Sequence, residues 1–473
     1  MSAIEQIYTN CLAQGSYFIE SNGEAAVIDP LREPGPYLQR AADRGVKIKY
    51  IFETHFHADF VSGHLDLAKK TGATIVYGPT AETAFDKHMA SDGEEFKVGE
   101  LTFKALHTPG HTPESTTYLL RKEDGSDHAI FTGDTLFIGD VGRPDLAQKA
   151  TNMTEQDLAG MLYDSLRSKI MKLKDEVIVY PAHGAGSACG KNMSSETFDT
   201  LGNQKRTNYA LRADMTKDEF IKEVTHGLSA PPQYFAKNAN LNKMGYGSLD
   251  QVMDKGLTAI SPQKFTNYTH DEKVLILDVR DKNEFVNGHV PNSVFIGLDG
   301  SFAPWVGALI TDIAQPIVIV TPKGREEETV RRLARVGYDN TIGYLDGGFE
   351  AWQKGGLDIS HIETKRMEDF VSNGIEHAES VVDVRKPGEY ETAHYEKANS
   401  APLDDFPKNV YSGLDKTKTH HLHCRSGYRS TVACSMLAKE GFKNVVNVIG
   451  NFDLIKNSEL PVSGSCPSLA HNN

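Results

Sequence analysis

The sequence predicts an α/β fold class, with one large N-terminal domain followed by two smaller domains of one kind. In the first half of the chain, short apolar strands alternate with helical patterns, and several strands end abruptly in His, Asp or Gly. In the second half, one α/β pattern occurs twice. A chain of 473 residues has room for about two to four domains, so both observations fit its length.

Composition and charge exclude several classes of protein. Hydrophobic residues make up 39% and charged residues 24% of the chain, as in ordinary globular proteins. Because 50 basic and 64 acidic residues give a net charge of -14, we expect no nucleic-acid partner and no membrane partner. No apolar run approaches the roughly 18–20 residues of a membrane span. Residues 1–8 show no signal-peptide pattern.

The cysteines indicate thiol chemistry in a reducing compartment. They number five, which is sparse and odd, and they lack the spacing of a disulfide framework. We therefore predict a cytoplasmic location. Cys11 and Cys434 stand among apolar residues, and we expect both to be buried.

The first predicted element is a hairpin. Residues 17–19 and 25–28 are apolar, and the dipeptide Asn22-Gly23 between them is typical of a type I′ turn. Further short apolar strands are predicted at residues 51–52, 75–77, 118–120, 129–131 and 177–180.

The repeat fixes the organisation of the second half. Asp278 and Asp383 are 105 positions apart, and so are Glu284 and Glu389. Each copy continues with an apolar strand, a loop rich in Gly and Arg, and a helix. The predicted boundaries are a first domain at 1–245, a linker at 246–262, the two copies at 263–358 and 363–462, and a flexible tail at 463–473.

Imidazoles and carboxylates gather at strand ends in four segments of the first domain. The sequence Thr-His-Phe-His-Ala-Asp begins two residues after the predicted strand 50–52, and three more segments adjoin an apolar strand or a Pro/Gly turn. Such ligands on loops at one edge of a sheet predict an open metal centre. The residues are His55, His57, Asp59, His111, Asp134 and His183.

These segments resemble the metallo-β-lactamase superfamily, whose signature is Thr-His-x-His-x-Asp-His followed by three later ligands. The resemblance covers residues 1–240 and implies an αββα sandwich. Phe60 stands where the family has its last His, which normally binds a second metal ion. Because Phe cannot coordinate a metal, this departure favours a mononuclear branch of the family.

The persulfide dioxygenases are such a branch. The resemblance implies one Fe(II) per chain, with open positions for a persulfide and O2, held by His55, His111 and Asp134. Three residues of the hydrolase pattern are then expected just behind the ligands, which they fix by hydrogen bonds: His57, Asp59 and His183.

Two further residues near this centre have alternative interpretations. Arg143 suits the carboxylate of a thiol carrier, or else forms a structural pair with Asp145. Cys189 lies six residues after His183. Its thiol could accept or relay sulfane sulfur, or it could simply fill a tight loop.

The second copy of the repeat contains a cysteine in an anion cradle. Cys424 follows an apolar strand and begins the loop Cys-Arg-Ser-Gly-Tyr-Arg, after which a helix is predicted. A loop at a helix N-terminus directs backbone N–H groups toward one point and so stabilises a thiolate. Gly427 allows the sharp turn, and Arg425 and Arg429 add positive charge.

This loop resembles the rhodanese active loop. Four residues separate Cys424 from Arg429, one fewer than in related phosphatases, so the cradle suits sulfur better than phosphate. The resemblance implies that Cys424 accepts sulfane sulfur as a persulfide and passes it on. The first copy has residues 318–325 at the corresponding place and no Cys, which predicts a rhodanese-like scaffold without transferase activity.

The domain order resembles fused persulfide dioxygenase/sulfurtransferases of sulfide detoxification. This implies that a low-molecular-weight thiol persulfide and O2 give sulfite, which then combines with sulfane sulfur to give thiosulfate. The thiol carrier stays open among glutathione, coenzyme A and bacillithiol, and we expect a homo-oligomer. The alternative is a zinc-dependent thioester hydrolase of the glyoxalase II type with attached rhodanese modules, which needs two metal ions.

Overall fold

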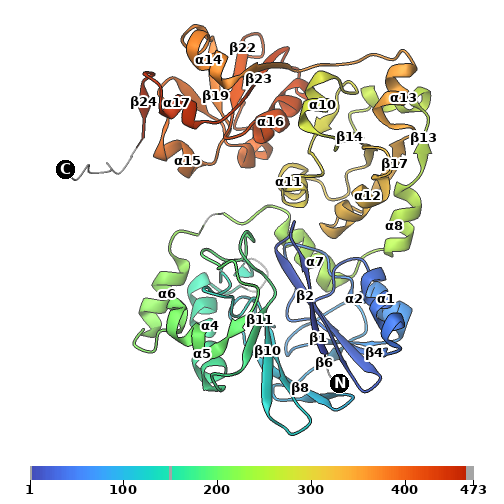
Figure 1. Cartoon of the computed structure of the whole chain (residues 1–473), viewed down its shortest axis with the longest axis vertical. Coiled ribbons are helices and arrows are strands. Elements are labelled where there is room, and N and C mark those ends of the chain that lie inside the picture. Colours follow the sequence, from blue (N-terminus) through green and yellow to red (C-terminus); the bar gives the residue numbers. More distant parts are fainter. Residues whose placement is uncertain (1–2, 149–151, 229, 465–473) are drawn as a thin grey trace, which may run out of the picture. The chain divides into compact units, whose positions relative to one another are not determined.

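The computed structural model of the chain describes residues 3–148, 152–228 and 230–464. The chain divides into two compact units, Met1–Gln251 with Ala334–Gly337, and Val252–Leu333 with Tyr338–Asn473. Both units mix helices with sheets, which confirms the predicted fold class (Figure 1). Within the described ranges, no helix is both long enough and apolar enough to cross a membrane.

The first unit contains two six-stranded sheets and six α-helices among the described residues. Its strands are β1 (Ala3–Thr9), β2 (Gln14–Ser21), β3 (Glu24–Ile28), β4 (Lys47–Phe52), β5 (Thr74–Tyr77), β6 (His88–Met89), β7 (Glu95–Val98), β8 (Leu101–His107), β9 (Thr116–Arg121), β10 (Asp127–Gly133), β11 (Ile178–Pro181) and β12 (Asp199–Thr200). Its helices are α1 (Gly35–Arg44), α2 (His64–Thr71), α4 (Glu155–Ser168), α5 (Leu201–Thr207), α6 (Lys217–Thr225) and α7 (Phe235–Met244).

These elements form a sandwich with the helices outside. One sheet has the order β1-β2-β3-β4-β5-β6 and the other β12-β11-β10-β9-β8-β7. Buried side chains from both sheets form the central core, among them Tyr17, Phe52, Phe103 and Phe131. Helices α1 and α2 cover the first sheet, and α4, α5 and α6 cover the second, each through a core of its own. The layers are therefore αββα, as predicted.

The predicted hairpin is present between β2 and β3. The two strands pair antiparallel, and the turn residues Asn22 and Gly23 have φ values of 46° and 80°. A type I′ turn needs a positive φ at both central positions, and Asn-Gly tolerates that conformation best. The other predicted strands of this domain overlap β4, β5, β9, β10 and β11.

Four strand ends bring the polar segments to the site. β3 and β4 run parallel in one sheet, and β10 and β11 run parallel in the other. Asp29 follows β3, the segment from Glu53 to Asp59 follows β4, Asp134 follows β10, and His183 comes shortly after β11. Parallel strands end at one edge of their sheet, so these residues are neighbours in space although they are far apart in sequence.

In its described part, up to residue 464, the second unit contains two five-stranded sheets and one two-stranded sheet. Their orders are β13-β17-β16-β14-β15, β18-β23-β22-β19-β21 and β20-β24. The strands are β13 (Ala259–Ile260), β14 (Leu275–Asp278), β15 (Val294–Phe295), β16 (Ile317–Val320), β17 (Thr341–Leu345), β18 (Glu363–Arg366), β19 (Ser380–Asp383), β20 (His394–Tyr395), β21 (Ala398–Ser400), β22 (Thr419–His423), β23 (Asn444–Ile449) and β24 (Val462–Ser463). The helices are α9 (Pro262–Phe265), α10 (Lys282–Asn287), α11 (Phe302–Leu309), α12 (Glu326–Arg335), α13 (Gly348–Lys354), α14 (Met367–Asn373), α15 (Pro387–Thr392), α16 (Tyr428–Lys439) and α17 (Asp453–Lys456).

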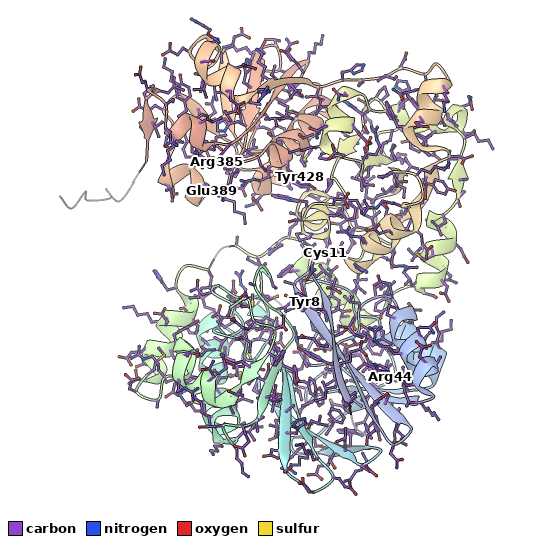
Figure 2. All side chains as sticks on the ribbon, in the orientation of Figure 1. Tyr8, Cys11, Arg44, Arg385, Glu389 and Tyr428 are labelled. Carbon is purple, nitrogen blue, oxygen red and sulfur yellow. The ribbon has the colours of Figure 1, made fainter. Side chains whose placement is uncertain are left out.

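The repeat extends to individual hydrogen bonds. In the first copy, Arg280 pairs with Asp278 and its Nη2 donates to the backbone carbonyl eight residues further on, at 2.9 Å. In the second copy, Arg385, which is labelled in Figure 2, pairs with Asp383 and makes the equivalent bond at 2.7 Å. Both arginines are buried, so each pair fixes the loop that follows its strand.

Two expected boundaries differ from the structure. Residues 246–262, predicted as a linker, contain helix α8 (Leu249–Gly256) and strand β13, and β13 pairs with β17 inside the first repeat copy. Ser463, predicted to begin a flexible tail, belongs to β24 and pairs with His394 of β20. Residues 465–473 of that tail lie outside the described residues.

Candidate metal centre and cysteine loop

The structure brings the three predicted metal ligands together. His55 lies in the loop after β4, His111 in the loop after β8, and Asp134 directly past β10. The Nε2 atoms of His55 and His111 lie 3.8 and 3.4 Å from Oδ2 of Asp134. All three side chains are buried, and their ligand atoms lie within 4.8 Å of one another. Two imidazoles and one carboxylate that converge in this way could hold one metal ion.

In both histidines a neighbouring oxygen lies close to Nδ1, which leaves Nε2 facing Asp134. Nδ1 of His55 lies 3.0 Å from Oγ1 of Thr54, and Nδ1 of His111 lies 2.8 Å from the carbonyl oxygen of Arg143. Burial, and then the neighbouring histidines, lower the pKa of His55 well below its usual range, so its imidazole is neutral and able to bind a metal. Bonds at Nδ1 fix the orientation of such ligands.

Asp134 shows that these residues suit a cation. Its carboxylate is buried, and neither of its oxygens has a hydrogen-bond donor within the part of the chain that the structure describes. A buried carboxylate without donors is costly, and a metal ion between it and the imidazoles of His55 and His111 would compensate its charge.

The three residues predicted just behind the ligands divide into two groups. Nε2 of His183 lies 3.5 Å from Oδ2 of Asp59 and 3.7 Å from Oδ1 of Asp134. Burial opposes protonation there, but the carboxylates of Asp59 and Asp134 outweigh it and raise the pKa of His183 well above its usual range. Nε2 of His57 instead lies 3.1 Å from Oδ1 of Asp29. His57, Asp59 and His183 can also offer three ligand atoms within 4.8 Å of one another.

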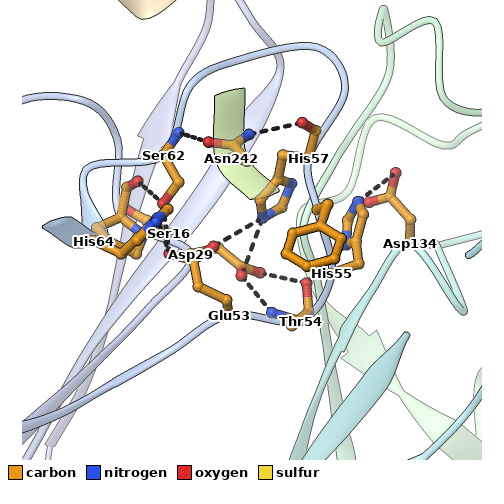
Figure 3. Close-up of polar contacts among 12 residues, drawn as sticks. Ser16, Asp29, Glu53, Thr54, His55, His57, Ser62, His64, Asp134 and Asn242 are labelled. Carbon is orange, nitrogen blue, oxygen red and sulfur yellow. Dashed lines mark hydrogen bonds and ion pairs between the residues drawn. The ribbon is translucent and has the colours of Figure 1, made fainter. Parts of the chain in front are cut away.

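Phe60 is buried beside His57, with ring centroids 4.4 Å apart. Its ring therefore fills the position of the missing histidine with apolar surface. Figure 3 shows His57 directed toward Asp29 and Glu53, whereas His55 is directed toward Asp134.

A buried polar network, which was not predicted, supports the histidine loop. Asp29 accepts hydrogen bonds from the backbone N–H and the hydroxyl of Thr54, each at 2.8 Å. Asn242 of α7 donates to the carbonyl oxygens of His57 and Phe60, at 2.7 and 2.8 Å. Asp29 follows a strand end, as the predicted ligands do, so the same signal could have found it. Asn242 is far away in sequence and gives no local signal.

Arg143 forms the structural pair that was one of its two interpretations. Nε and Nη2 of this buried arginine donate to the two carboxylate oxygens of Asp145, at 2.6 and 2.7 Å. The face of the guanidinium that would bind a carrier carboxylate is thus engaged. The main chain of Arg143 also orients the site, because its carbonyl oxygen holds His111 and its N–H donates to the carbonyl of Cys189 at 3.0 Å.

Cys189 lies at the metal centre. Asp134, His183 and Cys189 offer ligand atoms within 4.8 Å of one another, and all three are buried. Burial and the nearby carboxylates raise the pKa of the Cys189 thiol to about 12. The raised pKa favours the thiol over the thiolate at neutral pH. Of the two thiols expected to be buried, Cys434 is buried but Cys11 is only partly buried.

The predicted cradle surrounds Cys424 in the second unit. The residue follows β22 and is buried, and the backbone N–H of Gly427 donates to its Sγ at 3.1 Å. Its thiol lies 3.6 Å from the hydroxyl of Ser430 in α16. Gly427 has a φ of 93°, and a Cβ there would lie 2.9 Å from Ile449, so a glycine is needed.

The two arginines of the loop differ in their surroundings. Arg425 is exposed. Arg429 makes two bonds to the carboxylate of Glu389 in α15, at 2.6 and 3.0 Å. The hydrogen bond from Arg429 lowers the pKa of Glu389 to about 2. Arg429 therefore ties α16 to α15, in addition to placing positive charge near the loop.

The corresponding loop of the first copy keeps its shape without the nucleophile. Thr321 follows β16 as Cys424 follows β22. Gly324 comes three residues later with a φ of 84°, matching Gly427. The backbone turn is therefore retained while its chemistry is absent.

Comparisons with known proteins agree with a metal-dependent αββα domain joined to rhodanese-like domains. Residues 10–183 match the Metallo-beta-lactamase superfamily, and residues 261–355 and 367–458 match the Rhodanese-like domain. The chain belongs to the metallo-β-lactamase superfamily and carries two rhodanese-like domains after that domain.

Two curated relatives each cover less than half of the chain, and one solved structure covers more. Human "Persulfide dioxygenase ETHE1, mitochondrial" is 30% identical over 223 residues, covering 46% of this chain and 78% of the relative. The "Probable hydroxyacylglutathione hydrolase glo2" of Schizosaccharomyces pombe is 31% identical over 199 residues, covering 41% of this chain and 72% of the relative. The structure of a metallo-beta-lactamase from Staphylococcus aureus is 30% identical with a TM-score of 0.63, and the match covers 73% of this chain and 98% of that one.

Proposed function

We propose that the first domain is an Fe(II)-dependent persulfide dioxygenase and that the last domain is a sulfurtransferase. The first reaction is RSSH + O2 + H2O → RSH + SO3²⁻ + 2H⁺. The second is RSSH + SO3²⁻ → RSH + S2O3²⁻, so the pair converts a reactive persulfide into thiosulfate, as sulfide detoxification requires. The sparse cysteines fit a reducing cytoplasm. We also propose a homo-oligomer.

The observation that carries the dioxygenase proposal is the division of the histidines around Phe60. His55, His111 and Asp134 face one point, whereas His57 faces Asp29 and Phe60 fills the remaining position. This arrangement supports one metal ion with open positions, which non-haem Fe(II) oxygenases use for substrate and O2. The similarity to persulfide dioxygenases over the same domain supports the choice of iron and substrate.

Residues of the chain have separate tasks in the proposed reaction. His55 and His111 are the imidazole ligands, held by Thr54 and the Arg143 carbonyl, and Asp134 is the carboxylate ligand. Bound iron would supply the electronic coupling between persulfide and O2. His183 lies 3.5 Å from Asp59 and 3.7 Å from Asp134, and these carboxylates raise its pKa well above the usual range, so we propose that it donates a hydrogen bond to an anionic substrate sulfur. Its neighbour Cys189 is the thiol that we propose to contact the persulfide.

The sulfurtransfer step uses Cys424 as a nucleophile. Its Sγ attacks the outer sulfur of the persulfide, the S–S bond of RSSH breaks, and the carrier leaves as its thiol. Sulfite then attacks the outer sulfur of the Cys424 persulfide and releases thiosulfate and the Cys424 thiolate. The N–H of Gly427 stabilises the negative sulfur at both stages. Arg425 and Arg429 add positive charge for the sulfite.

The alternative is a zinc thioester hydrolase with two metal ions. The grouping of His57, Asp59 and His183 and the similarity to hydroxyacylglutathione hydrolases favour it. The two proposals differ in metal content and in O2 consumption.

Metal content after expression in iron-supplemented medium tests the proposal. We expect about one iron per chain and O2 consumption with a thiol persulfide. His111→Ala should lose the iron and at least about 100-fold in O2 consumption, because it removes a ligand. His226→Ala, at an exposed histidine of the same domain, is the matched control and should retain both. Two zinc ions per chain with thioester hydrolysis and no O2 consumption would establish the alternative instead.

A further inference from the structure

The Cys-less domain contacts the Cys424 loop on both sides of Gly427. On one side, Nζ of Lys282, the first residue of α10, donates to the carbonyl oxygen of Ser426 at 2.9 Å. On the other side, the hydroxyl of Tyr428, the first residue of α16, donates to the carbonyl oxygen of Gly297 at 3.1 Å. Both contacts lie inside the second unit.

Lys282 contacts the same peptide group whose N–H donates to the sulfur of Cys424. The carbonyl of Ser426 and the N–H of Gly427 belong to one planar trans unit, so they point in opposite directions. Lys282 holds the carbonyl end, and the N–H end donates to Sγ of Cys424 at 3.1 Å. A cation at the oxygen also polarises the peptide group, which strengthens the bond that its N–H makes to a negative sulfur.

The tyrosine contact anchors the beginning of α16 in the first repeat copy. Tyr428 is labelled in Figure 2, and its ring lies edge-on to Phe295, with centroids 5.7 Å apart. A Cβ on Gly300 would come within 2.7 Å of the same ring, so the ring fits directly against that backbone. The N–H of Phe295 also donates to the hydroxyl of Ser435 in α16, at 2.9 Å.

The carbonyl group of Gly427 is held by side chains of its own helix, α16. The hydroxyls of Ser430 and Thr431 donate to the Gly427 carbonyl, at 3.2 and 2.7 Å. By contrast, the carbonyl oxygen of Ser426 accepts a hydrogen bond from Lys282, which belongs to the other domain.

We propose that the Cys-less rhodanese-like domain is a positioning element of the Cys424 site, in which Lys282 and Tyr428 fix the 426–427 peptide so that its N–H faces the reacting sulfur. The proposal rests on the proposed function of Cys424. It gives the Cys-less domain a task at the reaction centre beyond scaffolding. Lys282 and Tyr428 are positioning residues, because they act through the loop and do not contact the sulfur.

The test measures the alkylation of Cys424 by iodoacetamide in the full chain, followed by mass spectrometry of the peptide that contains this residue. In Lys282→Met, we expect the rate at pH 6 to fall about threefold while the rate at pH 9 stays near that of the parent, because the thiolate is less well stabilised. Lys282→Arg should restore the parent's rate, and Tyr428→Phe should act like Lys282→Met. Lys273→Met, at an exposed lysine of the same domain, should have no effect.

Two results would overturn the proposal. One is parent rates at both pH values in Lys282→Met and Tyr428→Phe. The other is an equal loss at both pH values that Lys282→Arg does not restore, which indicates a distorted loop only. Thermal melting of each variant shows that the domain is folded. Iodoacetamide is not a sulfur donor, so this result is independent of whether the chain forms thiosulfate or consumes O2.

Discussion

Phe60 is the single residue on which the proposed metal stoichiometry depends. It is buried against His57, at the position where the superfamily has a histidine for a second metal ion. Phe60→His should therefore raise the zinc content toward two ions per chain. It should also lower O2 consumption about tenfold, since a second ion takes up positions that the substrates need. Metal analysis and oxygen-electrode rates measure both effects.

Phe56→His is the matched control for that change. It adds a histidine to the same loop at a half-buried position that packs on Tyr77. We expect it to leave the metal content unchanged. Unchanged metal content in Phe60→His as well would mean that Asp59, His183 and their neighbours set the stoichiometry without this residue.

At the residue scale, site residues that stand beside strand ends or turns could be predicted, whereas hydrogen-bond partners that are distant in sequence could not. His55, His111 and Asp134 could be predicted as a group because each stands beside an apolar strand or a turn, and the structure brings them together. Arg143 kept two interpretations, because sequence cannot tell whether an Arg two positions before an Asp pairs with it. Asn242 was missed because its hydrogen-bond partner His57 lies 185 positions earlier in the sequence.

Helices α15 and α16 are joined by one ion pair, Glu389 with Arg429, next to the Cys424 loop. The bond from Arg429 holds the pKa of Glu389 at about 2, below its unfolded value of about 4.3. A carboxylate whose pKa is lowered by folding stabilises the fold at pH values above its pKa in the unfolded state. This contribution is lost as the pH falls toward 2. Glu389→Gln should thus cost about 1 kcal/mol at pH 7, and the difference from the parent should narrow below about pH 4.3.

Urea unfolding followed by circular dichroism at pH 7, 5 and 3.5 measures this difference. Glu391→Gln, at an exposed position of the same helix, is the control and should differ from the parent by a constant amount. A difference for Glu389→Gln that does not change with pH would show that the pair contributes through packing and not through its charge.

At the element scale, the repeat spacing and the turn dipeptide predicted elements correctly, whereas a short strand without a strong apolar pattern could not be predicted. The hairpin around Asn22 was predicted because only a few dipeptides tolerate its turn. The repeat was predicted because Asp278 and Asp383 stand 105 positions apart in matching sequence segments, and the structure shows that each of them pairs with an arginine. Strand β13 was assigned to a linker because it has two residues, and its stability comes from pairing with β17 rather than from its own pattern.

At the scale of the whole molecule, the domain order and a scaffold role for the Cys-less copy could be predicted from sequence, but the contact of this copy with the Cys424 loop could not. Its loop keeps the left-handed Gly324 and lacks a thiol, which indicates only that it does not transfer sulfur. The bond from Lys282 to the loop of the other copy joins residues 144 positions apart. No periodicity in the sequence connects the two, so this relation became visible only in the folded unit.

The division of labour between the domains gives the last prediction. Cys424→Ser replaces the thiol inside the cradle with a hydroxyl that is far less acidic and cannot form a persulfide. The proposed iron ligands lie in the first unit and Cys424 in the second, so O2 consumption with a small persulfide should continue at the parent's rate. The product should shift from thiosulfate toward sulfite, with the early rate of thiosulfate formation reduced at least about tenfold. Early time points are needed, because sulfite also attacks persulfides in solution.

Cys11→Ser is the control, since this half-buried thiol lies in neither site, and it should leave both products unchanged. If Cys424→Ser forms thiosulfate at the parent's initial rate, the transfer step belongs to another thiol, and Cys189 is the next to test because it lies beside Asp134 and His183. If the variant instead stops consuming O2, oxidation depends on sulfur delivered through Cys424. Persulfide would then enter the chain at the last domain, and the two reactions would be steps of one obligatory sequence rather than independent activities of linked domains.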